Sequence, residues 1–189
     1  MQEPVYSVSI SLPDWIADVV DFSRTYGPDD ARMAVAVQLA AENVRRGTGG
    51  PFGAAVFEAV SGNLVAVGVN RVVPLGNSSL HAEIVALMLA QARRGTYSLG
   101  NGVAHELFTS CEPCAMCLGA APWSGVGRVV WAATREDAGR LKFDEGPVFQ
   151  ETYDYLRGRG IVFEAGPMRS DARDILARYS DVGGEIYNG

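Results

Sequence analysis

Cysteine is scarce in this chain, which has three among 189 residues. Two of the three are spaced like metal ligands, which leaves too few cysteines for a disulfide framework. Proteins of the reducing cytoplasm usually lack disulfides. Apolar runs are also short, and none approaches the ~18 residues of a membrane-spanning helix. The first residues contain no basic region of the kind that begins a signal peptide. We therefore expect a cytoplasmic protein with no membrane partner.

Positive charge is limited as well. Lys142 is the only lysine, and 16 basic residues stand against 22 acidic ones, which gives a net charge of −6 at pH 7. Because proteins bind nucleic acids largely by neutralising phosphates with lysine and arginine, this balance argues against a nucleic-acid partner. Charged residues make up 20% of the chain, too few for a disordered protein, and 48% hydrophobic residues suffice for a sizeable core.

The length is that of one globular domain, and we assign residues 1–28 to an N-terminal extension and residues 29–189 to the domain. Hydrophobic periodicity and turn residues predict an α/β order of elements. Strands are expected at residues 54–60, 64–69, 105–109, 128–133 and 161–165. Helices are expected at residues 14–22, 28–46, 81–94, 113–121, 148–157 and 170–179.

The pattern with the most chemical information begins at His81 and ends at Cys117. His81 and Glu83, two residues apart, are followed about thirty residues later by Pro113, Cys114 and Cys117. An H-x-E…P-C-x-x-C pattern is the signature of zinc-dependent base deaminases. Zinc prefers cysteine and histidine ligands, and a catalytic site takes three from the protein and leaves the fourth position to water. The sequence therefore predicts one catalytic zinc ion per chain, held by His81, Cys114 and Cys117.

Glu83 is not needed as a ligand, and this separates the pattern from a structural zinc site. Zinc lowers the pKa of bound water from ~15.7 to ~7. A carboxylate beside the metal can accept a proton from that water and pass it to a ring nitrogen and then to the leaving amine. Cys114 and Cys117 are three residues apart on a predicted helix that begins at Pro113, and a helix N-terminus favours thiolates. The pattern predicts hydrolytic loss of ammonia from a ring carbon, with Glu83 as the proton shuttle.

Cys111 leaves two alternatives open, because it forms a second C-x-x-C with Cys114. One is a structural site of three cysteines and His81, although Cys111 precedes the predicted helix and its side chain need not converge on the ion. The other is a redox pair of cysteines, which leaves His81 and Glu83 without a role.

The glycine-rich segment 47–53 has two interpretations. It contains neither of the common phosphate-binding patterns, G-x-x-x-x-G-K-[ST] and G-x-G-x-x-G. It is either a plain turn or part of a pocket wall.

Four segments resemble the cytidine-deaminase superfamily, and within it the bacterial guanine deaminase branch. They are residues 49–56 (GGPFGAAV), 70–73 (NRVV), 81–83 (HAE) and 109–120 (TSCEPCAMCLGA). The segments that favour the guanine deaminase branch, including relatives that accept aminotriazines, are 123–126 (WSGV), 143–147 (FDEGP) and 186–188 (IYN). The resemblance covers residues 29–189, and the zinc motif itself belongs to the whole superfamily.

The resemblance implies a three-layer α/β/α sandwich with a mixed five-stranded sheet and zinc between two helices. It implies a homodimer, in which C-terminal segments could be exchanged, and hydrolysis of guanine to xanthine and ammonia. Asn70 would hydrogen-bond the purine, and Phe52 and His81 would flank its ring. The backbone of Ala82 and the carboxylate of Glu83 would meet the ring edge.

The resemblance also implies a second carboxylate, Glu145, near the departing amine. Two acids in different environments can divide the proton transfers, and the loop 143–147 suits a lid over the substrate. Asp144 is the second candidate for this role. Alternatively, Asp144 and Glu145 are both solvated charges of the loop. Trp123 would contact the base or belong to the core. Tyr187 would either be part of a frayed end or fold over the site, including that of a partner subunit.

Three rival functions share parts of this pattern. A tRNA adenosine deaminase has the same zinc motif, but we would expect its C-terminal helix to be basic, whereas residues 170–179 mix acidic and arginine side chains. A deaminase of cytosine, cytidine or an aminotriazine such as ammeline stays open, because pocket shape decides it. A zinc-stabilised scaffold without catalysis would leave Glu83 unexplained.

Overall fold

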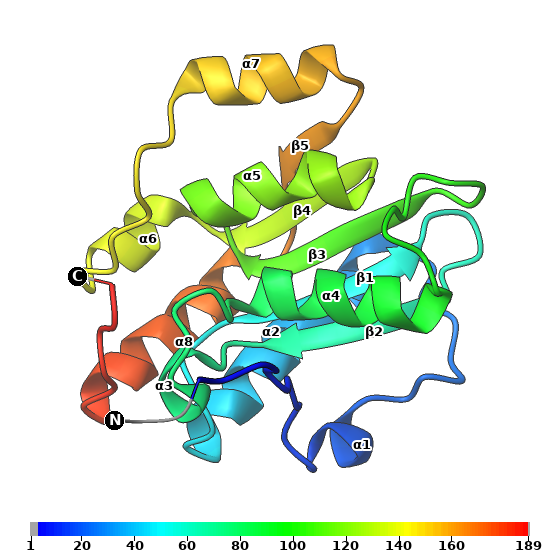
Figure 1. The fold of residues 1–189 in the computed structure, drawn as a ribbon. Helices are drawn as coiled ribbons and strands as arrows, with labels where there is room; N and C mark the ends of the chain where they lie inside the picture. Colours follow the sequence, from blue (N-terminus) through cyan, green and yellow to red (C-terminus); the bar gives the residue numbers. More distant parts are fainter. Residues whose placement is uncertain (1–3, 189) are drawn as a thin grey trace.

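A computed structural model describes residues 4–188, and its centre is a five-stranded sheet in the order β2-β1-β3-β4-β5 (Figure 1). β1 pairs antiparallel with β2 and β3, whereas β3 with β4 and β4 with β5 are parallel. The strands are Gly53–Glu58 (β1), Leu64–Val69 (β2), His105–Cys111 (β3), Arg128–Ala133 (β4) and Val162–Ala165 (β5). The predicted mixed five-stranded sheet is confirmed.

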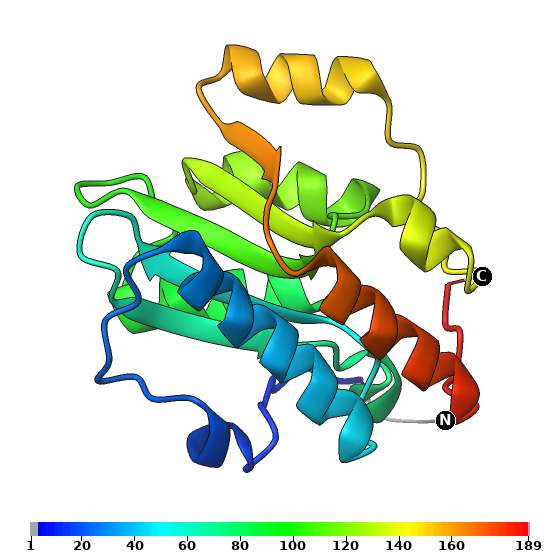
Figure 2. The same cartoon turned by 180° about the vertical axis from the view of Figure 1, so that it is seen from behind.

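Helices cover both faces of the sheet, which confirms the predicted three layers. Two long helices, α2 and α8, lie on one face, and α4 and α5 lie on the other (Figures 1 and 2). The helix α7 lies on the α5 side and stands further from the sheet. The helices are Ile16–Val19 (α1), Asp29–Arg45 (α2), Val72–Leu75 (α3), Ala82–Arg94 (α4), Ala115–Ser124 (α5), Arg135–Gly139 (α6), Gln150–Gly158 (α7) and Arg169–Asp181 (α8).

The central strands read as continuous apolar runs because helices bury both of their faces. All six residues of β2 are buried, and so are the first five of β1. Gly68 lets α4 approach β2 closely, since a Cβ there would lie 2.1 Å from the carbonyl oxygen of Ala82. This contact sets the first turn of α4, and with it His81 and Glu83, directly on the sheet.

Strand directions fix where a ligand can bind. Because β2 and β3 both run opposite to β1, and β4 is parallel to β3, their C-terminal ends at Val69, Cys111 and Ala133 share one edge. In open α/β sheets, ligands bind outside the carboxyl ends of the strands. The N-termini of α4 and α5 lie at the same edge, where the positive ends of the helix dipoles favour anions and thiolates.

Two predicted helices have wrong bounds, and two short helices were not predicted. The helix α5 begins at Ala115 and not at Pro113, because Cys114 is its N-cap with extended backbone angles (φ −68°, ψ 174°). The helix expected at residues 14–22 is the single turn α1, and the short helices α3 and α6 were not predicted. Their four and five residues are too few to show a helical period.

Much of the predicted extension packs on the domain. Trp15, Ile16 and Tyr26 are buried against the α2 face of the sheet. The boundary at residue 28 stays a prediction. The predicted extension includes residues 1–3 and the predicted domain includes Gly189, and these four residues lie outside the described ones. Within residues 4–188, no helix has the length and apolar character needed to cross a membrane.

Candidate active site

The three predicted ligands meet at the start of two helices. His81 is the N-cap of α4, Cys114 is the N-cap of α5, and Cys117 lies in the first turn of α5. The Nδ1 atom of His81 lies 3.5 Å from Sγ of Cys114 and 3.7 Å from Sγ of Cys117. All three ligand atoms lie within 4.8 Å of one another. The sequence spacing therefore produces one compact donor set.

This donor set fits a tetrahedral zinc ion. Zn–S and Zn–N bonds of ~2.3 and ~2.05 Å at tetrahedral angles separate sulfur from nitrogen by about 3.6 Å, which matches the two measured distances. A hydrogen bond from Cys117 and the neighbouring His81 lower the pKa of the Cys114 thiol to about 4, although burial opposes this. Thiolates are the form that binds metals. Within residues 4–188, no other cluster of three histidine, cysteine or acidic side chains has such geometry.

Cys111 does not belong to the donor set. Its Sγ lies 3.6 Å from the carbonyl oxygen of Thr134, and its side chain packs in the core under α2 and α8. Burial raises the pKa of its thiol well above the usual range. The structure therefore favours the set of one histidine and two cysteines over the alternative with three cysteines.

Glu83 is the second residue of α4 and lies in its first turn, beside the donor set and at the pocket wall. It is only 6% exposed. Burial, and then the negative charge of Cys114, raise the pKa of Glu83 to about 7. A carboxyl group with this pKa can both accept and release a proton near neutral pH.

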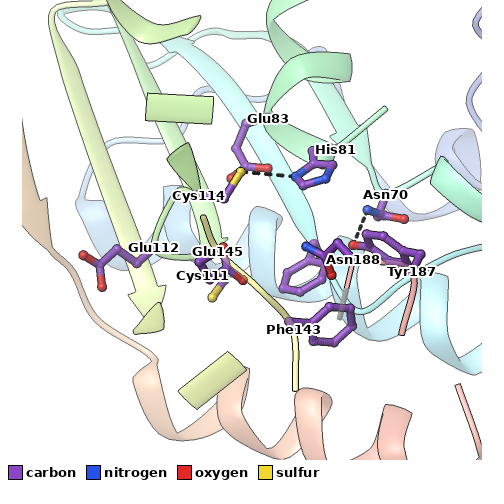
Figure 3. A pocket seen from close by; sticks show the side chains of 11 residues that line it. Asn70, His81, Glu83, Cys111, Glu112, Cys114, Phe143, Glu145, Tyr187 and Asn188 are labelled. Carbon is purple, nitrogen blue, oxygen red and sulfur yellow. Dashed lines mark hydrogen bonds between the residues drawn. The ribbon is translucent and has the colours of Figure 1, made fainter. Parts of the chain in front are cut away.

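Glu145 and Asp144 have different surroundings, although they are neighbours in the sequence. Asp144 is exposed, and its carboxylate accepts a hydrogen bond from the backbone of Gly146 at 2.8 Å. Glu145 lines the pocket (Figure 3), and burial raises the pKa of its carboxyl group to about 8. Its backbone oxygen accepts a hydrogen bond from the N–H of Ala115 at 2.9 Å. Of the two predicted carboxylates, the structure brings only Glu145 into the pocket.

Aromatic rings form much of the remaining wall. The ring of Phe143 lies 5.1 Å from that of Phe52 and 5.4 Å from that of Tyr187, and Tyr187 lies 6.0 Å from His81. A flat heterocycle can pack against such rings. The pocket is lined by Phe52, Asn70, His81, Glu83, Cys111, Glu112, Cys114, Phe143, Glu145, Tyr187 and Asn188 (Figure 3).

The glycine-rich segment supports this pocket and is more than a turn. The side chain of Asn43 donates hydrogen bonds to the carbonyl oxygens of Gly50 and Asn70, at 2.8 and 3.0 Å. A Cβ at Gly49 would lie 2.0 Å from the carbonyl oxygen of Asn70. The segment and the end of β2 can therefore approach only because residue 49 has no side chain.

The C-terminal tail closes the pocket of its own chain. The side chain of Asn70 donates a hydrogen bond to Oη of Tyr187 at 2.7 Å. Asn188 donates from its side chain to the carbonyl oxygen of Asp144 at 2.7 Å and accepts from the Asp144 N–H at 3.3 Å. The tail thus joins the end of β2 to the Glu145 loop within one chain.

One predicted contact lies elsewhere, and another stays a prediction. Trp123 is 81% exposed and borders a surface groove between α5 and α7, so the structure does not bring it to this pocket. It lies six residues beyond Cys117, which is ~9 Å along a helix. Ala82 is fully buried between His81 and Glu83, so only its backbone could meet a ligand.

Sequence reasoning missed three lining residues as individual site members: Glu112, Phe143 and Asn188. Each lies within a segment that carries the family resemblance, and this was the available signal. Their positions in the pocket depend on long-range contacts.

The fold and the donor set are those of a zinc-binding deaminase, and the comparison with known proteins supports this class. Residues 28–133 match the family model of the cytidine and deoxycytidylate deaminase zinc-binding region. Guanine deaminase of Bacillus subtilis (strain 168) is 40% identical over 128 residues, which are 68% of this chain and 79% of that protein. The chain therefore belongs to the cytidine and deoxycytidylate deaminase family, as predicted.

Solved structures extend the similarity to nearly the whole chain. The structure of guanine deaminase from Nitrosomonas europaea has a TM-score of 0.88 and 41% identity, and the match covers 95% of this chain and 100% of that one. A related structure in complex with 2,6-diaminopurine has a TM-score of 0.87 and 43% identity, with 95% and 96% covered.

Proposed function

We propose that this protein is a zinc-dependent guanine deaminase, which hydrolyses guanine to xanthine and ammonia. One observation carries the proposal: a zinc-type donor set, the buried Glu83 and the half-buried Glu145 share one aromatic-lined pocket. The two guanine deaminases at 40% and 41% identity support guanine as the base.

His81, Cys114 and Cys117 would hold one zinc ion per chain. When bound, zinc lowers the pKa of a coordinated water to ~7 and so supplies hydroxide at neutral pH. The three side chains would orient the site from the starts of α4 and α5, where the positive ends of the helix dipoles favour thiolates.

Glu83 would move the first proton. Attack at C2 of guanine requires a proton to leave the attacking water and another to reach a ring nitrogen next to C2. N3 is the neighbour with a free lone pair, so Glu83 would carry the first proton of the water to N3 and then accept the second as the C2=O bond forms. Its buried position at the donor set serves this role.

Glu145 would act as the second acid. The N–H of Ala115 holds its backbone at the start of α5, next to Cys114. In its protonated form, Glu145 would donate to the 2-amino nitrogen as the C2–N bond breaks and ammonia leaves. The proton that Glu83 accepts from the C2 hydroxyl would then return to Glu145, so that both groups regain their starting forms. Two carboxyl groups whose pKa values differ can divide such steps between them.

Recognition of the base would rest on Asn70 and the aromatic wall. The Asn70 amide offers both a donor and an acceptor to the purine edge, and the backbone at Ala82 lies beside His81. Phe52 and His81 would flank the ring, while Tyr187 would cover the pocket from the tail.

We also infer a cytoplasmic homodimer with no nucleic-acid partner. The free thiols of the donor set need a reducing compartment. Trp123 and Tyr155, 81% and 62% exposed, border the groove between α5 and α7, a surface that a second copy would cover. Light scattering should give twice the chain mass, and Trp123→Ser should shift it towards the monomer. A wild-type monomer at all concentrations would contradict the dimer.

The deciding experiment is ammonia release by protein of known zinc content. We would test guanine, cytosine, cytidine, adenosine, ammeline and a tRNA, with Glu83→Gln as the matched variant. We expect release from guanine, and a loss of ~10²–10⁴-fold in turnover for Glu83→Gln with zinc retained. Release from another base alone would keep the mechanism and refute guanine as the substrate. No release from any base by zinc-loaded protein would refute the enzyme.

A further inference from the structure

The carboxylate of Glu112 joins three separate parts of the chain. One oxygen accepts a hydrogen bond from Oη of Tyr153 at 2.6 Å and lies 3.1 Å from Nε of Arg135. The other oxygen accepts from the backbone N–H of Arg135 at 3.1 Å. The Glu112 backbone N–H donates to the carbonyl oxygen of Ala133 at 2.8 Å. Glu112 is therefore fixed at the end of β4 while its side chain binds α6 and α7.

These partners flank the loop that carries Glu145. Arg135 opens α6, Tyr153 lies in α7, and the loop runs between the two helices. Glu112 itself lies two residues before Cys114. The helices on both sides of the Glu145 loop are thus bound to Glu112, close in sequence to the proposed metal ligand Cys114. Figure 3 shows the Glu112 carboxylate pointing away from His81, so Glu112 does not face the reacting atoms.

Tyr153 is the polar anchor of a loosely attached helix. α7 stands apart from the sheet (Figure 1), and its buried residues are Tyr153 and Leu156. The Tyr153 ring packs 5.8 Å from Phe163 and 6.3 Å from Trp131. The ring thus holds the helix by apolar packing, whereas the hydroxyl makes the one bond to Glu112. The two contributions can be separated by removing the hydroxyl alone.

We propose that the Tyr153–Glu112 hydrogen bond is a positioning device that sets the distance of Glu145 from the metal ligands. The proposal rests on the guanine deaminase function proposed above. Tyr153 acts through α7 and the loop, and the final contact is the Ala115 N–H bond to the Glu145 backbone. A displacement of ~1 Å in a reacting group can lower turnover ~10²-fold, so a remote hydroxyl can affect the rate.

The test compares Tyr153→Phe with Tyr155→Phe in the zinc-loaded protein. Tyr155 lies on the same helix, on the groove that a second copy would cover, so Tyr155→Phe controls for the loss of a hydroxyl from α7 and for any effect through that surface. For Tyr153→Phe we expect a ~10- to 100-fold lower kcat on guanine, with zinc content unchanged and KM changed much less. The double variant Tyr153→Phe with Glu145→Gln should be no slower than Glu145→Gln alone, because the two residues act in one unit. Additive losses would overturn the proposal.

A second readout does not depend on the substrate. Hydrogen exchange at the Ala115 amide and in residues 143–149 should become faster in Tyr153→Phe and stay unchanged in Tyr155→Phe. Faster exchange confined to α7 would show a merely structural role and would overturn the proposal. Lack of guanine turnover by the wild type, together with the expected exchange pattern, would refute the proposed substrate and leave the positioning role supported.

Discussion

Asn70 and Tyr187, 117 positions apart in the sequence, are joined by a hydrogen bond of 2.7 Å from the Asn70 amide to the tyrosine hydroxyl. The bond connects the end of β2, where the purine would be read, to the tail that covers the pocket. Burial raises the pKa of Tyr187, so its hydroxyl stays protonated at all physiological pH values. The amide that we propose as the purine contact is therefore also the one that binds the tail.

Tyr187→Phe should weaken guanine binding more than catalysis. The variant keeps the ring against Phe143 but removes the hydroxyl that orients Asn70. Loss of one such bond is worth ~1 kcal/mol, so we expect KM to rise ~5-fold with kcat nearly unchanged. Tyr97→Phe, at a site 84% exposed, is the control. An unchanged KM would show that Tyr187 has no part in recognition.

Glu145→Gln should lower turnover on guanine by ~10²-fold while zinc and fold are retained, because the amide cannot donate the acidic proton to the amine. Steady-state kinetics and zinc analysis check this. Asp144→Asn is the neighbouring control, since Asp144 is exposed and only accepts from the Gly146 backbone. If Asp144→Asn lost the activity and Glu145→Gln kept it, the two assignments would have to be exchanged.

Cys114→Ala should lose the zinc ion and lower the melting temperature. Two remaining ligands hold zinc weakly, and metal binding contributes directly to the stability of a folded site. Metal analysis and thermal unfolding, with and without a chelator, measure both effects. Cys111→Ser should keep one zinc ion per chain, because Cys111 lies outside the donor set. Loss of zinc in Cys111→Ser would instead support the alternative site of three cysteines and His81.

Gly49→Ala should disturb Asn70 although it alters no lining residue. The new Cβ would lie 2.0 Å from the Asn70 carbonyl oxygen and 2.8 Å from the side chain of Asn43, so one of the segments has to move. We expect a weaker guanine complex and a lower melting temperature. Gly27→Ala, where nothing lies within 4 Å of the added carbon, should change neither. Equal behaviour of the two variants would refute the close contact.

The zinc donors were predictable because their geometry is local. Cys114 and Cys117 are three residues apart at a helix start, and His81 precedes another helix by one position, so the spacing in the sequence fixes most of each orientation. Glu83 follows from its offset from His81 in the same way. The α/β layers were also predictable, since buried strands appear as apolar runs bounded by turns.

The sequence by itself thus determined the class of the fold and the donor set of His81, Cys114 and Cys117 with Glu83 beside it. Only the tertiary structure decided that Glu145, and not Asp144, faces the pocket, that Tyr187 closes it, and that Trp123 lies outside it. These outcomes depend on packing between segments far apart in the chain, such as the bonds from Asn70 to the tail and from Ala115 to the Glu145 loop. The hydrophobic periodicity of the sequence does not reveal such contacts, because each depends on which loop ends the folded sheet brings together.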